Sequence, residues 1–371
     1  MSILTTCIIL EFGFRVVDGE FRFINFLGEE RTLFKSAYPS DFDPLLGWIP
    51  QEGVTSVNNV WGKKVTILEN GIRSNGTRSG NWSDTSPILA VGDSFTFGDE
   101  VSDSETWPAA LERLLQRPVI NGGVFGYGLD QSFLRAKQLA EIYRPEVLLV
   151  GIIADDIGRC ELSARTGANK PYFIVQGDQL VLQNVPVPRP SHEAHEGNFR
   201  SLLGRSYLVH RQMMKCCPHW WLMGVTWKKF YSARRVHTNG NRVACLLLGE
   251  LVTMARQTGI KRVLVVIQYT KDLFVQEFER IESLLKYCTP ESGMEIVDLG
   301  AKLVHIRKTQ PDRYEQFFNN HMTAEGNAFV AHQLLSSIDG PSEKDHRTAR
   351  ERNHSETAVI RGVADQLILL R

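Results

Sequence analysis

The stretch Ile88-Leu-Ala-Val-Gly-Asp-Ser-Phe-Thr-Phe-Gly98 joins an apolar run of strand length to an abrupt polar end. A short, continuous apolar run is typical of a buried strand in a parallel sheet, and ligands bind beyond the carboxyl ends of such strands. Because the run ends in Gly92-Asp93-Ser94, it places a hydroxyl group at the exit of the strand. Ser94 is therefore the candidate nucleophile.

The sequence that follows alternates between helical and strand patterns, which predicts an α/β fold with a parallel sheet. The further strands are expected at residues 118–120, 146–153, 262–267 and 295–299, and the helices at 104–116, 130–143, 241–257, 272–287 and 323–337. Pro108 suits the first turn of its helix, where its missing N–H costs no hydrogen bond. Asp130 is the expected cap of the helix that it begins.

An insertion interrupts this alternation at about residues 160–239. Tyr172-Phe-Ile-Val175 and Leu180-Val-Leu182, with a Gly177-Asp178 turn between them, predict a hairpin. The segment from His210 to Tyr231 is rich in Trp and Met. It is interpreted either as a lid or membrane-interface patch or as a small satellite core over the sheet, and the second interpretation is favoured because most aromatic clusters are buried.

The composition is that of an ordinary globular protein, and it narrows the function classes. Forty-two basic and forty-two acidic residues cancel, so no overall field favours nucleic acid or an acidic surface. The chain has no dinucleotide fingerprint, no Gly-Lys-Ser or Gly-Lys-Thr phosphate loop and no metal-ligand spacing among its histidines and six cysteines. We therefore expect no cofactor, no metal and no nucleic acid partner, but a neutral small molecule.

The N-terminal run from Ile3 to Phe14 is apolar but shorter than a bilayer span, has no basic region before it and is interrupted by Glu11. It is interpreted as the shortened end of a membrane segment or, equally, as a first strand or core segment. Membrane association is thus left open without support from a full transmembrane segment. No signal in the sequence fixes the compartment or the oligomeric state.

With these motifs together, the chain resembles the SGNH/GDSL hydrolases, most of which are esterases and lipases. The resemblance rests on the Ser94 stretch, on Asn121-Gly-Gly-Val-Phe-Gly-Tyr-Gly128 and on His321-Met-Thr-Ala-Glu-Gly326, and it extends over about residues 38–338. Leu46-Gly47-Trp48 followed by Gly71-Ile72-Arg73 is similar to a bacterial branch with an N-terminal extension. The resemblance implies a flavodoxin-like three-layer α/β/α sandwich.

Three parts of the chain follow from these patterns. Residues 1–80 are expected to be an N-terminal extension packing on the catalytic domain, residues 81–339 the SGNH hydrolase-like domain with its insertion, and residues 340–371 a charged linker with a short tail.

The resemblance also implies the parts of an active site. His321 would be the general acid and base for Ser94, and the backbone N–H groups of Ser94 and Gly126 would stabilise an oxyanion together with a side chain at position 155. Asp93 would support the nucleophile.

Two positions depart from the family pattern. The family has an asparagine at the position of Asp155, and an ionised aspartate accepts hydrogen bonds but cannot donate them. The family has an aspartate three residues before the histidine, where this chain has Phe318. A backbone carbonyl or Asn319 is then expected to hold the imidazole, with Glu315 as a substitute if its loop folds back.

These residues predict an SGNH-type serine esterase that hydrolyses short-chain acyl esters, among them O-acetyl groups on saccharides. Two alternatives stay open from the sequence. An O-acyltransferase would use the same acyl-enzyme, and a catalytically impaired carbohydrate-binding or assembly protein would explain the two departures.

Overall fold

The computed structural model describes residues 3–76, 86–165, 167–189, 198–223, 234–288 and 294–338. At its centre lies a five-stranded sheet in which every neighbouring pair is parallel, in the order β13-β12-β7-β5-β6. These strands are β5 (Ile88–Val91), β6 (Val119–Asn121), β7 (Val147–Ile152), β12 (Arg262–Ile267) and β13 (Met294–Asp298). The order is that of flavodoxin, with the first strand beside the second and third. The predicted three-layer α/β/α fold is confirmed.

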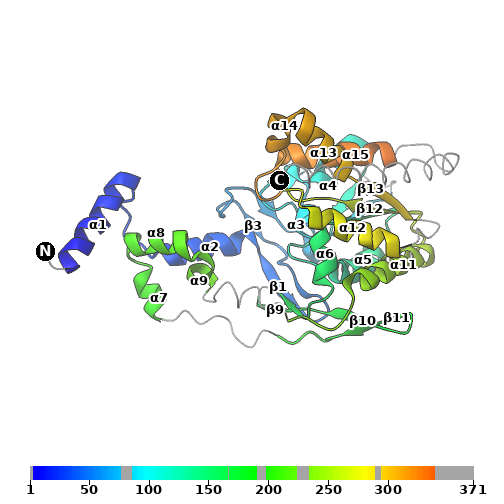
Figure 1. Ribbon diagram of the computed structural model, residues 1–371, viewed down its shortest axis with the longest axis horizontal. Coiled ribbons are helices and arrows are strands. Elements are labelled where there is room, and N and C mark those ends of the chain that lie inside the picture. Colours follow the sequence, from blue (N-terminus) through cyan, green and yellow to red (C-terminus); the bar gives the residue numbers. More distant parts are fainter. Residues whose placement is uncertain are drawn as a thin grey trace.

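Helices cover both faces of the sheet (Figure 1). On one face α4 (Trp107–Leu115) packs against α15 (Ala324–Ile338), and on the other α11 (Gly240–Thr258) packs against α5 (Leu129–Tyr143) and α12 (Val275–Tyr287). Sandwiched in this way, β5 and β7 are buried along their whole length. This double burial explains why both strands consist of unbroken apolar runs.

Three details of the helices correct the sequence predictions. The cap of α5 is Gly128, and Asp130 lies inside the first turn, where it is fully buried. The helix expected from residue 272 begins only at Val275. Helices α13 (Gly300–Thr309) and α14 (Pro311–Gln316) were not predicted, because the sequence between the last strand and His321 has only a weak apolar periodicity.

The insertion contributes the predicted hairpin, formed by β10 (Tyr172–Gln176) and β11 (Gln179–Gln183). A buried ion pair between Lys170 and Asp130 fastens it to α5. The Lys170 ammonium group also donates to the carbonyl oxygens of Arg159, Leu162 and Pro171. Small two-stranded sheets complete the elements near the body, from β1 (Ser40–Asp43), β2 (Gly47–Pro50), β3 (Thr55–Ser56), β4 (Val65–Thr66), β8 (Ala164–Arg165) and β9 (Ala168–Asn169).

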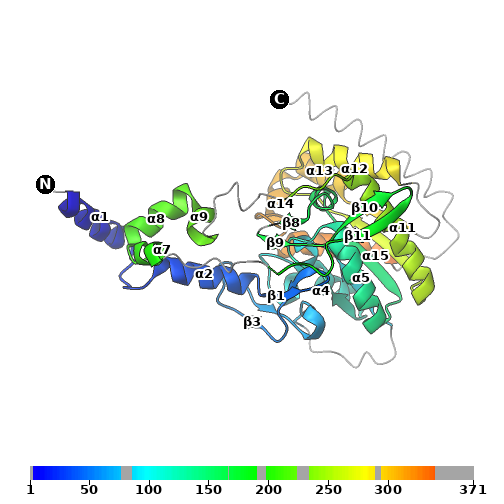
Figure 2. The same ribbon diagram turned by 90° about the horizontal axis from the view of Figure 1, so that it is seen from below.

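In the described ranges, five helices form an arm that lies to one side of the α/β body in both views (Figures 1 and 2). This helical arm consists of α1 (Ile3–Asp18), α2 (Phe26–Ala37), α7 (Asn198–Leu203), α8 (Tyr207–Cys216) and α9 (Pro218–Met223). The N-terminal run is therefore a helix on the surface, and its interpretation as a first strand or core segment is wrong.

The Trp-rich segment of the insertion packs within this arm. Trp221 is fully buried and donates its indole N–H to Nδ1 of His210 at 2.9 Å, and the His210 ring stacks on Phe26 of α2. A satellite core exists, as expected, but it forms against the N-terminal helices and not over the sheet. Trp227 and the tail at 340–371 lie outside the described residues.

We predict that Lys170→Met lowers the free energy of unfolding by roughly 3 kcal/mol or more, because the substitution leaves the buried Asp130 carboxylate without its cation. Urea denaturation measures the change. Lys261→Met is the matched control, because Lys261 makes its ion pair with Glu146 on the surface, where such a pair contributes about 1 kcal/mol at most. Equal effects of the two substitutions would contradict the role of the buried pair.

Candidate active site

Ser94 is the first residue of α3 (Ser94–Phe97), directly beyond the carboxyl end of β5. The turn between them depends on Gly92, whose φ is +156° and where a Cβ atom would lie 2.6 Å from the carbonyl oxygen of Gly151. Asp93 caps α3 by accepting the N–H of Phe95 at 2.9 Å. The nucleophile candidate is thus held by a strand, a glycine turn and a side-chain cap.

The structure brings His321 to this serine from the far end of the chain. Its loop precedes α15, and its Nε2 lies 3.0 Å from Oγ of Ser94. The Phe95 ring packs against the imidazole with 5.2 Å between centroids. The geometry is that of a serine and a base within hydrogen-bond reach.

Glu100 holds the other nitrogen of the ring. Its Oε1 lies 3.1 Å from Nδ1 of His321, and its Oε2 accepts the backbone N–H of Asn320 at 3.2 Å. Glu100 was not predicted, because the family pattern places the acid three residues before the histidine, whereas Glu100 follows the nucleophile by six positions. Its φ of +69°, rare for a residue with a side chain, belongs to the turn that follows α3.

The residues considered earlier for this role lie elsewhere. The Glu315 carboxylate is exposed and pairs with Lys271 at 2.7 Å. Asn319 donates its backbone N–H to the carbonyl oxygen of His321, which shapes the loop without a described contact to the ring. Phe318 is buried and packs on Tyr314, so an aspartate there would not face solvent or the site.

Carboxylates determine the titration of His321. Burial lowers its pKa, but the hydrogen bond that His321 donates to Glu100 and the negative charges of Asp99 and Glu100 outweigh burial and raise the pKa above its ordinary value. For Glu100 burial acts in the opposite direction and raises the pKa, but the hydrogen bond and the charge of His321 are stronger and lower it below its ordinary value. The pair therefore stabilises an imidazolium beside a carboxylate, the state that forms when the base takes a proton.

A second carboxylate, Asp99, lies under the same ring. Its Oδ2 is 3.7 Å from Nε2 of His321, and burial raises its pKa to about 7 despite the opposing charge of His321. Asp99 and His321 therefore lie close enough for the charge of each group to affect the protonation of the other.

The two backbone amides that the sequence predicts for an oxyanion site are those of Ser94 and Gly126. The N–H groups of Ser94 and Gly126 donate to no other residue within the described ranges. The loop that carries Gly126 packs on the nucleophile turn, since the N–H of Val124 donates to the carbonyl oxygen of Gly92 at 3.0 Å. Gly126 has a φ of +76°, which favours glycine at this position.

Asp155 lies in the first turn of α6 (Ala154–Arg159) with its carboxylate 76% exposed, and the partner given by the structure is Arg159 at 3.8 Å. Because Arg159 also pairs with Asp93 at 3.1 Å, one guanidinium group lies between Asp155 and the nucleophile turn. The next residue, Asp156, turns inward and accepts the N–H of Ile153 at 3.0 Å. That position 155 lines the oxyanion site stays a prediction, and an ionised carboxylate there offers an oxyanion no hydrogen-bond donor.

Asp93 takes part in a buried charge network. Its Oδ2 lies 3.1 Å from Nη1 of Arg159, which also donates to Asp156 at 2.6 Å and to the carbonyl oxygen of Tyr127 at 2.7 Å. One guanidinium group thus ties the nucleophile turn, the glycine loop and α6 together. Asp93 supports Ser94 through this network and through its cap on α3.

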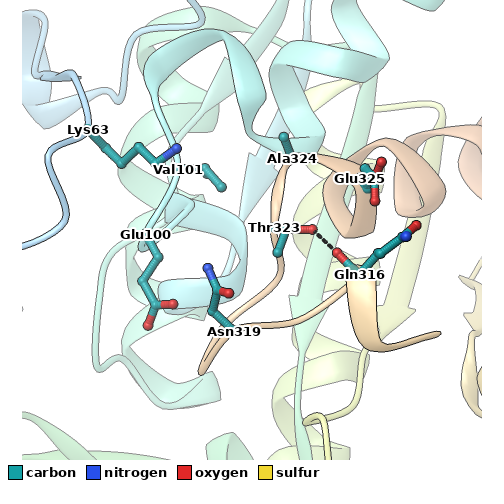
Figure 3. Close-up of a pocket in the computed structure, with 8 residues that line it drawn as sticks. All are labelled: Lys63, Glu100, Val101, Gln316, Asn319, Thr323, Ala324 and Glu325. Atoms are coloured by element: carbon teal, nitrogen blue, oxygen red, sulfur yellow. Dashed lines mark hydrogen bonds between the residues drawn. The ribbon is translucent and has the colours of Figure 1, made fainter. Parts of the chain in front are cut away.

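A pocket of about 320 Å³ lies beside Glu100 (Figure 3). Glu100 and Asn319 lie on one side of it, and Gln316 lies across from them, with its carbonyl oxygen accepting the Thr323 hydroxyl at 2.6 Å. The other lining residues are Lys63, Val101, Ala324 and Glu325. Most of these side chains can donate or accept hydrogen bonds.

Within the described ranges, no cluster of three or more His, Cys, Asp or Glu side chains is arranged to hold a metal ion. The described cysteines are free thiols. The groups at this site are those of acid–base and nucleophilic chemistry.

No family model matches the chain, and no curated protein sequence matches it. Solved structures of similar fold include a member of the lipolytic protein G-D-S-L family from Veillonella parvula DSM 2008, at 12% identity and a TM-score of 0.38 over 69% of this chain and 99% of that one. A catalytic mutant of Axe2, an acetylxylan esterase from Geobacillus stearothermophilus, matches at 12% identity and a TM-score of 0.39, over 68% of this chain and 94% of that one. A two-domain esterase, CEX, active on acetylated mannans, matches at 12% identity and a TM-score of 0.36, over 70% of this chain and 51% of that one. At these values we base the functional proposal on this chain's own residues.

We predict that His321 titrates above 6.5 in the intact protein and that Glu100→Gln lowers its pKa, because the substitution removes the charge facing Nδ1. NMR of the imidazole nitrogens measures both values. Glu325→Gln, in the same pocket, is the control and leaves the pKa of His321 unchanged. The same His321 pKa in the Glu100 variant and in the unmodified protein would refute the assignment.

Proposed function

We propose that this protein is an SGNH-type serine esterase that hydrolyses short-chain acyl esters through an acyl-enzyme on Ser94. The observation that carries the proposal is the continuous chain of contacts from Oγ of Ser94 through His321 to Glu100, at 3.0 and 3.1 Å. A nucleophile, a base and a group that orients the base are the three parts that activate a hydroxyl. Glu100 also takes the place of the aspartate that the family has at position 318. The absence of that aspartate had favoured an impaired site.

The reaction follows from these positions. As Oγ of Ser94 attacks the ester carbonyl carbon, its proton passes to Nε2 of His321, and Glu100 stabilises the imidazolium through Nδ1. The imidazolium then protonates the leaving alcohol oxygen as the ester C–O bond breaks, which leaves the acyl group on Ser94. Water gives a proton to His321 as its oxygen attacks the acyl carbon, and the imidazolium then returns that proton to Oγ of Ser94 as the bond between Oγ and the acyl carbon breaks and the carboxylic acid leaves.

The N–H groups of Ser94 and Gly126 would bind the oxyanion in both steps. Both amides are without another acceptor in the described part of the chain. A third donor, expected at position 155, is lacking because an ionised aspartate only accepts hydrogen bonds. Loss of one such donor typically lowers the rate on the order of a hundredfold, so we expect a slow esterase.

For the substrate we propose O-acetyl groups on saccharides. The pocket beside Glu100 has the polar side chains that sugar hydroxyls require, and its volume of about 320 Å³ suits a small ring better than a long acyl chain. The described residues around it carry charges of both signs, Lys63 against Glu100 and Glu325, which favours an uncharged ligand.

We predict that the purified chain hydrolyses p-nitrophenyl acetate faster than the butyrate, and that Ser94→Ala and His321→Ala each lower kcat by roughly a thousandfold or more. A chromogenic assay at neutral pH measures this, with circular dichroism to show that the variants fold. Activity retained in Ser94→Ala would exclude the acyl-enzyme. A folded chain that hydrolyses neither ester but acetylates an added sugar would point to the transferase instead.

The pH dependence gives a separate prediction. The base must be neutral, so kcat rises with pH through the pKa of His321, which lies above 6.5. Glu100→Gln lowers kcat by roughly a hundredfold and moves this rise to lower pH, because the imidazole then loses its proton more easily. Glu325→Gln keeps the original profile. A Glu100 variant with a reduced rate but an unshifted profile would contradict direct contact with His321.

A further inference from the structure

Helix α1 exposes large apolar side chains, while its ion pair of Glu11 and Arg15 faces inward. Arg15 is 4% exposed and donates to Glu11 at 2.7 Å, while Ile8, Ile9, Leu10, Phe12, Val16 and Val17 are all exposed. A helix of a globular protein normally shows the opposite pattern, with its apolar stripe inward. The surface of α1 therefore needs a partner of its own.

Polar contacts to α8 fix this orientation. The Glu11 carboxylate accepts the N–H groups of Tyr207 and Leu208 and the hydroxyl of Ser206, so it satisfies the first turn of α8. Asp18 accepts the Tyr207 hydroxyl at 2.9 Å and pairs with Arg211 at 2.7 Å. Rotating α1 to bury its apolar side would break all of these contacts.

The exposed apolar surface is too wide for a single docked helix. With 3.6 residues per turn, the six exposed side chains from Ile8 to Val17 span about 200° of the helix circumference. None of the exposed residues between Thr5 and Val17 is charged. A protein partner covers a stripe of about half that width, whereas hydrocarbon can surround the whole surface.

The rest of the arm has the features of a membrane interface. Phe21 and Phe23 after α1, and Phe199 and Leu202 on α7, are exposed large apolar side chains. Residues 198–223 contain four basic residues and no acidic one; Arg200 is buried and Arg211 pairs with Asp18, so the exposed Arg205 and Lys215 are the cations that face solvent. An apolar helix beside basic residues fits a bilayer with anionic headgroups.

The position of α1 permits this contact. Both views place it at the end of the arm farthest from the sheet (Figures 1 and 2). In the described ranges no helix has the length together with the apolar content that crossing a membrane requires. From these observations we propose that α1 inserts its apolar side into an anionic lipid bilayer and that the helical arm holds the α/β body beside that surface.

The test is co-sedimentation of the full chain with vesicles of phosphatidylcholine and phosphatidylglycerol. We expect the protein to sediment with the vesicles, and the double variant Ile9→Glu, Phe12→Glu to lower the partition coefficient roughly tenfold or more. The matched control, Ile142→Glu with Phe274→Glu, changes side chains of similar exposure on the body: 53% and 49%, against 54% and 56% in α1. The control keeps the original partition coefficient, and thermal melts show that both variants fold.

Absence of vesicle binding by the unmodified chain would overturn the proposal, as would equal losses in the two double variants. Analytical ultracentrifugation without lipid tests a second copy of the chain as the occupant. A dimer that the α1 variant alone dissociates, with no vesicle binding, would show that self-association covers α1. The proposal is independent of the esterase activity, because α1 contributes no residue to the Ser94 site.

Discussion

The hydrogen bond between Ser94 and His321 depends on the parallel sheet more than on any local sequence. The two residues are separated by most of the chain, and only the common edge of β5 and its neighbours, together with the loop before α15, brings Nε2 within 3.0 Å of Oγ. A parallel sheet aligns the carboxyl ends of its strands, so residues that follow different strands meet there. The position of the site is thus a consequence of the sheet topology. The turn at Gly92 adds to this, because it places Ser94 directly beyond the carboxyl end of β5.

The sheet and the nucleophile were predictable because both produce local patterns. Doubly buried strands such as β7 leave continuous apolar runs, and Gly92-Asp93-Ser94 directly follows one of them. Glu100 was not predictable in this way. Its contact with His321 depends on a residue with positive φ after a four-residue helix, and neither the turn nor the partner leaves a periodic signal.

The different surroundings of Asp155 and Asp156 also could not be predicted from a local pattern. Two adjacent carboxylates look equivalent in the sequence, but a helix turns successive residues by about 100°, so one points outward and the other inward. Asp156 meets Arg159 and the N–H of Ile153, and Asp155 meets solvent. Their roles follow from where α6 begins, and helix starts are set by packing that sequence patterns describe only approximately.

The body and helix α1 of the arm differ in what they bury. In the body, apolar strands lie between helices, and the buried charges Lys170 and Asp130 neutralise each other. In the arm, Glu11 and Arg15 face inward, and removing them from α8 would leave the N–H groups of Tyr207 and Leu208 without an acceptor. Because a buried, unpaired polar group costs more than an exposed leucine, these contacts hold the apolar face of α1 outward. The exposed face is therefore a property of the folded arm that only a partner from outside the arm can cover.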